Sequence, residues 1–337
     1  MLRDLMLEPL KDIQNLYRAA LLRKKAERGA AAPFFFGRLT ELKKLSRSHR
    51  DFLSGSQYTD LIISGGIGSG KTYLLSHYMR NSGIKGTKVL ELVCYEAERK
   101  IEYRVLSLLI GKMLKALKVD TKDLPESYRQ ILVYFFPFMF GKGAHDGQSD
   151  VKDGKLPFFE LEELLSELFA RLTARAKFVI VIDDIRYCDR MSFDFIQRVA
   201  LCKYHGRALF FISCHDSWLK EYLKTFDKNT LRNIDILELK NFRRDEVEAI
   251  ASRRLKDPAP ETVDALYKES GGNPLYLFEI INSLKDNKPV NNYKFIYLLE
   301  NRLKTLSSYE QMALYISSAF FSDIMPEAVA DIIGVDS

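Results

Sequence analysis

A glycine-rich stretch in the first quarter of the chain has the residue types that bind phosphate. The run GGIGSGKTY occupies positions 65–73 and satisfies the pattern GxxxxGK[ST] in full. A chain of this length matches that pattern by chance roughly once in a hundred. In such a loop backbone N–H groups converge on an anion, the lysine bridges the β- and γ-phosphates of a nucleotide, and the threonine hydroxyl holds Mg²⁺. The alternative is a glycine turn with an incidental lysine. The predicted nucleotide ligands are Gly65, Gly66, Ile67, Gly68, Ser69, Gly70, Lys71, Thr72 and Tyr73.

A pair of carboxylates supplies the second part expected of a metal–phosphate site. Asp183 and Asp184 directly follow the apolar run FVIVI. A nucleotide-bound Mg²⁺ needs an acidic residue at the end of a strand next to the phosphate loop. We therefore predict that Thr72 and Asp183 hold the metal and that Asp184 activates water as a general base. The alternative is an acidic turn after a buried strand.

The segments around these residues predict the elements that must position them. YTDLIIS, before the glycine loop, is typical of a strand buried on both faces. KTYLLSHYMRNSG, after it, has apolar residues at helical spacing and is predicted to be a helix that stops at Gly83. The same alternation recurs along the chain. Further strands are predicted at 87–95, 178–184, 208–214 and 234–240, and further helices at 103–117 and 156–177. Alternating strands and helices predict an α/β fold with a parallel sheet covered on both faces.

From about residue 241 the pattern changes to helices alone. RDEVEAIASRRL, ETVDALYKES and PLYLFEIINSLKD are each predicted to be helical. The segment 141–156 is polar and rich in glycine, which indicates a surface insertion. Four parts are therefore expected: an N-terminal linker helix at 1–32, a nucleotide-binding domain at 33–240, a helical lid domain at 241–290 and a further helix-rich segment at 291–337.

Composition and charge narrow the functional class. The 337 residues are 47% hydrophobic, which suits a globular protein, and no long apolar segment predicts a membrane span. The four cysteines lack CxxC spacing, which favours a reducing, cytoplasmic location. The net charge of +6 is spread along the chain, so nucleic acid is not the expected partner.

Several motifs resemble those of one family, the AAA+-like P-loop ATPases of the STAND type. PFFFGRLTELKKL is similar to the family's entry motif, and VIDDIRYCDRMSFDFI is similar to its Walker B strand. The resemblance implies that Phe36, Gly37 and Arg38 lie near the adenine. It also implies that Ser213, in ALFFISCHDSW, is the polar sensor of the fourth strand. His215 occupies a position where the family usually has arginine, so hydrolysis is expected to be slow.

The resemblance continues through ESGGNPLYLFEII, which is similar to the family's Gly-Asn-Pro element. It implies that Asn273 and Pro274 start a helix that contacts the nucleotide, and that the segment 291–337 is part of a winged-helix-like unit. FFFGR, IRYCDRMS and GGNPLYL are most similar to the ATPase-like region of the soluble (type 10) adenylate cyclases. No cyclase catalytic domain is visible in the sequence.

The leading hypothesis is an ATP·Mg²⁺-binding regulatory switch, with slow ATPase activity, in a larger signalling protein. It would exchange ATP and ADP and act on other domains of a longer chain or on a protein partner. A DNA-associated AAA+ initiator is the first alternative, although SSYEQMALYISSAFF lacks the basic residues of a recognition helix. A scaffold that has lost hydrolysis is the second. The P-loop pattern does not decide whether the chain is an active enzyme.

Overall fold

The computed structural model describes residues 36–82, 85–135, 158–203, 207–225, 231–285 and 311. Within these residues the chain divides into two compact units. The sheet unit consists of Arg38–Asn241 together with Asn273–Leu275. Of the described residues, the helical unit contains 36–37, Phe242–Gly272, 276–285 and 311.

The sheet unit is built on a parallel sheet of five strands in the order β2-β3-β4-β1-β5. The central strands β1, β3 and β4 are rich in apolar residues because helices cover both of their faces. In this order β1 lies beside β4, and β4 lies beside β3. The carboxyl ends of these three strands therefore meet at one edge. The strands are β1 Asp60–Gly65, β2 Lys88–Val93, β3 Phe178–Asp183, β4 Ala208–His215 and β5 Ile234–Glu238.

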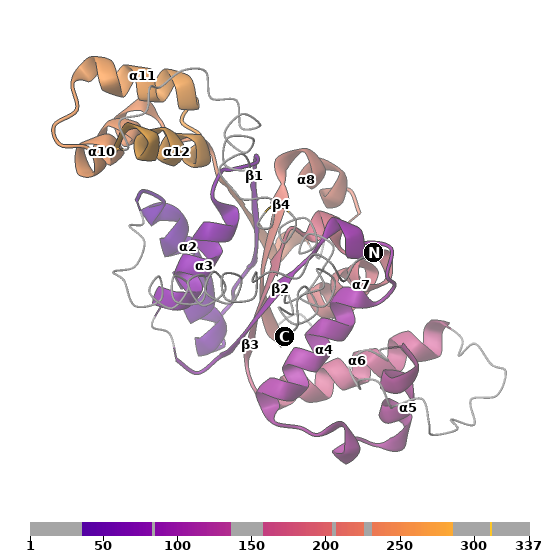
Figure 1. The fold of residues 1–337 in the computed structure, drawn as a ribbon. Helices are drawn as coiled ribbons and strands as arrows, with labels where there is room; N and C mark the ends of the chain where they lie inside the picture. The colour runs from indigo at the N-terminus through magenta and orange to yellow at the C-terminus, as the bar shows by residue number, and fades with distance from the viewer. Residues whose placement is uncertain are drawn as a thin grey trace, which may run out of the picture. The chain divides into compact units, whose positions relative to one another are not determined.

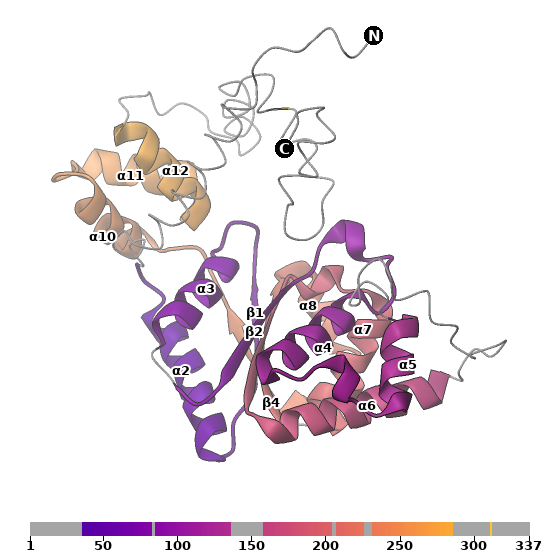
Figure 2. The same cartoon turned by 60° about the horizontal axis from the view of Figure 1, so that its bottom comes forward.

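Helices cover both faces of this sheet (Figure 1). One face carries α2 and α3, and the other carries α4, α6, α7 and α8, with α5 packed on α6 (Figure 2). The α-helices of the unit are α2 Leu39–Ser54, α3 Lys71–Asn81, α4 Arg104–Leu117, α5 Glu126–Phe135, α6 Phe158–Arg175, α7 Arg190–Phe195 and α8 Asp216–Leu223. Short 3₁₀ turns lie at Glu96–Glu98, Thr121–Asp123 and Ile185–Tyr187, and a π-helical segment, Ile196–Lys203, continues α7.

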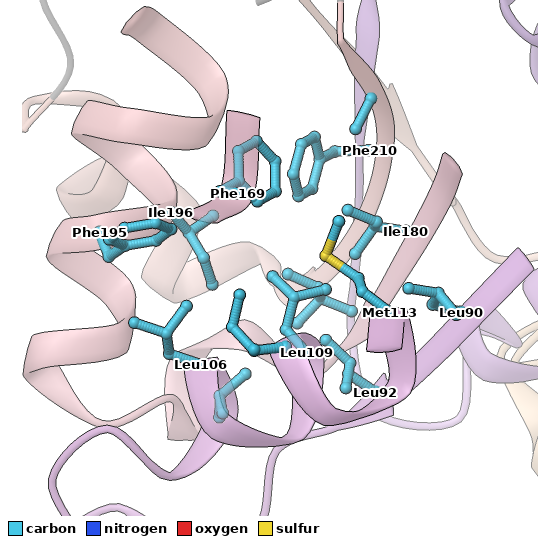
Figure 3. Packing of buried hydrophobic residues seen from close by; sticks show 14 of the residues in the cluster. Leu90, Leu92, Leu106, Leu109, Met113, Phe169, Ile180, Phe195, Ile196 and Phe210 are labelled. Carbon is cyan, nitrogen blue, oxygen red and sulfur yellow. The ribbon is translucent and has the colours of Figure 1, made fainter. Parts of the chain in front are cut away.

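The main core lies between the sheet and the layer that contains α4, α6 and α7 (Figure 3). Along α4 the apolar residues recur every three or four positions, so they form one stripe that faces the sheet. Leu106, Leu109 and Met113 of this stripe are fully buried beside Leu90, Leu92 and Ile180 of the strands. The core fixes the strands whose ends carry the predicted site.

The helical unit has a smaller core of its own. Its helices are α10 Arg244–Arg254, α11 Pro260–Ser270 and α12 Pro274–Lys285. Pro260 suits the first turn of α11 because that turn has no intrahelical acceptor for a backbone N–H. The buried residues of this core are Phe242, Val247, Ile250, Ala251, Val263, Leu266, Leu277, Ile280 and Ile281.

The predicted α/β architecture is confirmed, with a parallel sheet, helices on both of its faces and, in the described stretch from 242 to 285, helices alone. The strand expected at 87–95 is shorter, Lys88–Val93, and the helix that follows the glycine loop ends at Asn81. The predicted linker helix at 1–32, the insertion at 141–156 and all of the winged-helix-like segment except residue 311 lie outside the described residues. Among the helices that are described, none has the length and apolarity needed to cross a membrane.

Candidate nucleotide-binding site

The glycine loop connects β1 directly to α3. β1 ends at Gly65 and α3 begins at Lys71. Gly68 and Gly70 have φ angles of +76° and +92°, a left-handed conformation that glycine adopts without the strain that a Cβ would bring. α3 starts directly after this loop, so the positive end of its dipole lies at the loop, as an anion site requires. Ile67 and Tyr73 are exposed beside it, at 63% and 42%.

Lys71 bonds to the first two residues of the loop. Its Nζ donates hydrogen bonds to the carbonyl oxygens of Gly65, at 2.8 Å, and Gly66, at 2.9 Å. Burial lowers the pKa of Lys71 below its ordinary value, and the nearby carboxylates of Asp184 and Asp183 oppose that shift. The ammonium group therefore bonds the loop carbonyls and is also stabilised by the charges of the acidic pair.

The acidic end of β3 is joined to the loop by a chain of hydrogen bonds. Thr72 Oγ1 donates to Asp183 Oδ2 at 2.8 Å, and Ser213 Oγ, on β4, donates to Asp183 Oδ1. The same Ser213 hydroxyl accepts the backbone N–H of Asp184 at 2.9 Å. Residues predicted separately from three segments, Thr72, Asp183 and Ser213, are thus brought together by the strand order.

These oxygens fit Mg²⁺. A hydroxyl and a carboxylate are hard ligands of the kind that Mg²⁺ prefers, and Mg²⁺ at such a loop takes its remaining ligands from phosphate and water. Among the described residues, no three His, Cys, Asp or Glu side chains gather into a site of their own. Thr72 and Asp183 are the residues that would hold the ion.

His215 is the last residue of β4 and pairs in register with Gly65. Its Nδ1 accepts the backbone N–H of Ser217 at 3.2 Å and lies 2.9 Å from Asp216 Oδ1. The imidazole therefore caps the start of α8. An imidazole, unlike a guanidinium, supplies no permanent positive charge to a phosphate.

Arg38 contacts the loop from the other side. Its Nη2 donates to the carbonyl oxygen of Ser69 at 3.4 Å and to that of Lys240 at 2.5 Å. Phe36 belongs to the helical unit, where its ring packs on the small core and Arg253 lies 5.1 Å above it. Gly37, with φ of +69°, precedes Arg38. Proximity of these residues to adenine stays a prediction.

The Gly-Asn-Pro element also contacts the loop. Asn273 Nδ2 donates to the carbonyl oxygen of Ile67 at 2.8 Å, and the backbone N–H of Leu275 donates to that of Gly68 at 3.2 Å. Pro274 is the first residue of α12 and is buried. A Cβ on Gly68 would lie 2.7 Å from Asn273 Oδ1 and 2.8 Å from Leu275 Cβ, so only glycine fits there.

Three contributions were missing from the sequence prediction. Leu275 contributes its backbone N–H, and a backbone hydrogen bond of this kind cannot be predicted from the type of residue. Asp189 is buried and accepts the N–H groups of Tyr103, Val105 and Ser192, so it fixes the starts of α4 and α7. Arg186 forms an ion pair with Asp184. This pair could have been predicted from the sequence, because Arg186 lies only two residues after that acid.

The strand order, the glycine loop and the acidic pair together define a P-loop ATPase fold. The sequence matches the model of the AAA ATPase domain over residues 35–212, more than half of the chain, and the chain belongs to that family. None of the curated proteins compared with the chain matches it.

Several solved structures resemble the chain in fold. A STAND protein with a tetratricopeptide repeat sensor from Pyrococcus horikoshii is 17% identical, with 90% of this chain and 37% of that protein covered and a TM-score of 0.48. The ORC1 protein of Aeropyrum pernix, in complex with DNA, is 14% identical, with 89% and 83% covered and a TM-score of 0.47. The Thermotoga maritima RuvB Holliday junction branch migration motor is 16% identical, with 90% and 83% covered and a TM-score of 0.37. This chain therefore spans little more than a third of the STAND protein.

Proposed function

We propose that this AAA ATPase module is a nucleotide-dependent switch that binds ATP·Mg²⁺ and hydrolyses it slowly. The observation that carries the proposal is the hydrogen bond of 2.8 Å between Thr72 Oγ1 and Asp183 Oδ2. It joins the end of the phosphate loop to the acidic end of β3, and these are the two places from which a P-loop protein holds a nucleotide-bound metal.

Each residue of the site has a distinct part in this function. The loop N–H groups and Lys71 would bind the phosphates, while Thr72 and Asp183 would hold Mg²⁺, which would neutralise charge on the phosphate oxygens. Asp184 accepts a proton from the attacking water. Ser213 orients both acids through its two hydrogen bonds.

The switch would act through the loop itself. Asn273 and Leu275 bond the carbonyl oxygens of Ile67 and Gly68, so a change in the loop when the γ-phosphate is present or lost reaches the first turn of α12. A two-state response of this kind needs no fast turnover.

Slow hydrolysis follows from position 215. Positioning and charge stabilisation supply nearly all catalysis of phosphoryl transfer, and a missing arginine can cost a factor of about 10³ or more. Because position 215 is a histidine, it has no guanidinium to offer the γ-phosphate. Its Nδ1 instead accepts the N–H of Ser217 at the start of α8.

The finer identity rests on sequence motifs alone. FFFGR, IRYCDRMS and GGNPLYL favour a module of a larger cytoplasmic signalling protein related to the soluble adenylate cyclases, with other domains or a protein as its partners. A DNA-associated initiator ATPase and a hydrolysis-deficient scaffold are the alternatives.

The proposal is tested by measuring ATP turnover of the wild type and of His215→Arg over a range of protein concentrations. We expect slow turnover by the wild type and a rise in the variant, because the arginine restores a permanent cation. A wild-type turnover of several per second, with no gain in the variant, would favour an ordinary ATPase motor. If a neighbouring subunit supplies an arginine, the turnover per protein molecule should rise with protein concentration. Tight binding of a labelled DNA duplex at physiological salt would favour the initiator.

A further inference from the structure

Arg186 contacts the predicted general base on both of its carboxylate oxygens. Its Nε lies 2.9 Å from Asp184 Oδ1, and its Nη2 donates a hydrogen bond to Asp184 Oδ2 at 3.2 Å. The Nε and Oδ1 atoms are close enough for a salt bridge but do not have hydrogen-bond geometry. The two side chains are therefore joined by one hydrogen bond and one further electrostatic contact. A carboxylate engaged in this way has fewer free lone pairs for the proton of a water molecule.

The local backbone holds this pair together. Asp184 has φ of 54° and ψ of 56°, a left-handed conformation that is uncommon outside glycine and often found at functional sites. The 3₁₀ turn Ile185–Tyr187 follows at once, and the backbone N–H of Asp184 is bonded to Ser213. The Arg186 guanidinium also lies 4.4 Å above the ring of Tyr187, which favours its place beside Asp184.

The pair interacts electrostatically with Lys71 of the phosphate loop. The Arg186 guanidinium is near enough to Lys71 to oppose the charge of that ammonium group, while Asp184 favours it. The two side chains keep 28% and 31% of their surface exposed, so a solute can reach them. Asp184 is therefore placed for catalysis, but it is already engaged by a cation of its own chain.

We propose that Arg186 is a positioning residue that withholds Asp184 from the attacking water and so restrains intrinsic hydrolysis. The inference rests on the proposed function and gives a second cause of slow turnover, independent of His215. In the restrained step, the water oxygen forms a bond to the γ-phosphorus while the bond from that phosphorus to the β,γ-bridging oxygen breaks. Asp184 receives the water proton and returns it to the products, ADP and inorganic phosphate.

The test is single-turnover hydrolysis of ATP by Arg186→Gln, measured together with ATP affinity. We expect the rate to rise about fivefold, the factor that corresponds to release of a partly exposed ion pair, with affinity changed by less than about twofold. Arg186→Lys keeps a cation but loses the fork of donors, so its rate should fall between the two. Arg190→Gln is the matched control, since Arg190 is 91% exposed and pairs only loosely, at 3.9 Å, with Asp194.

A double-mutant cycle separates this role from a general structural one. In an Asp184→Asn background, Arg186→Gln should change the rate by less than about twofold, because the base that it restrains is gone. A fall in rate in Arg186→Gln, or no change in it, would overturn the inference while the ATP switch still stands. A rise that persists in the Asp184→Asn background would also overturn it. Absence of ATP binding by the wild type would instead refute the proposed function.

Discussion

The two ends of the same parallel sheet treat carboxylates in opposite ways. At the carboxyl end, Asp183 and Asp184 are partly exposed, Asp183 accepts hydrogen bonds from Thr72 and Ser213, and Asp184 accepts one from Arg186, two residues further on. At the amino end, Asp60, the first residue of β1, is 2% exposed and accepts the backbone N–H of Phe210 at 2.8 Å. Burial raises the pKa of Asp60 to about 8.

This difference in exposure distinguishes the acids of the candidate nucleotide site from an acid that supports the fold. Acids at the carboxyl end are held in place but stay open to a solute, so changing them should alter ligand binding more than stability. The acid at the amino end is removed from water, so changing it should alter stability and its pH dependence.

Asp189 sharpens this comparison because it lies near the carboxyl end but is buried at 2% exposure. Replacing it by alanine leaves the N–H groups of Tyr103, Val105 and Ser192 without their acceptor. We expect Asp189→Ala to lower the free energy of unfolding by about 4 kcal/mol, since each unsatisfied buried donor costs about 1–3 kcal/mol. Urea denaturation measures this. A loss below about 1 kcal/mol would show that water replaces the carboxylate.

Asp60 should make stability depend on pH. Its pKa is raised on folding, so its stabilising contribution is complete below about pH 4 and is lost as the pH rises toward 8. We expect the free energy of unfolding to fall by about 2 kcal/mol between pH 6 and pH 8, and Asp60→Asn to remove that fall. Denaturation at a series of pH values checks this, and equal slopes in both proteins would contradict it.

Gly68 tests whether the crowded side of the loop matters for binding. A Cβ there would meet Asn273 and Leu275, whereas Gly55 has a similar φ, +74°, and open space around it. Both substitutions to alanine carry the same backbone strain, about 1 kcal/mol. We expect Gly68→Ala to weaken ATP binding about fivefold, while Gly55→Ala leaves ATP affinity unchanged. Equal ATP affinities in the two variants would show that the crowding around Gly68 does not matter for binding.

Much of the fold and part of the site could be predicted from sequence because their signals are local. The glycine loop is contiguous, and its strand and helix show their own periodicity. Arg38 illustrates what could not be predicted, because its guanidinium bonds Ser69 and Lys240, and these meet only because β5 lies beside β1. The burial of Asp60 depends on strand order in the same way. Asp189 caps the N–H of Ser192 three residues further on, but its other partners, the N–H groups of Tyr103 and Val105, lie on a distant segment and could not be predicted.

The central claim is that the carboxyl end of the sheet binds the phosphates of ATP, and calorimetric titration of Lys71→Ala with Mg·ATP tests it most directly. Lys71 contacts only loop carbonyls through the hydrogen bonds described for it, so the variant should stay folded. Lys220→Ala, an exposed lysine on α8, is the control. We expect Lys71→Ala to lose at least about 100-fold in affinity, about 2.7 kcal/mol, while Lys220→Ala binds like the wild type. Undiminished Mg·ATP affinity in a folded Lys71→Ala protein would contradict the assignment of the phosphate site.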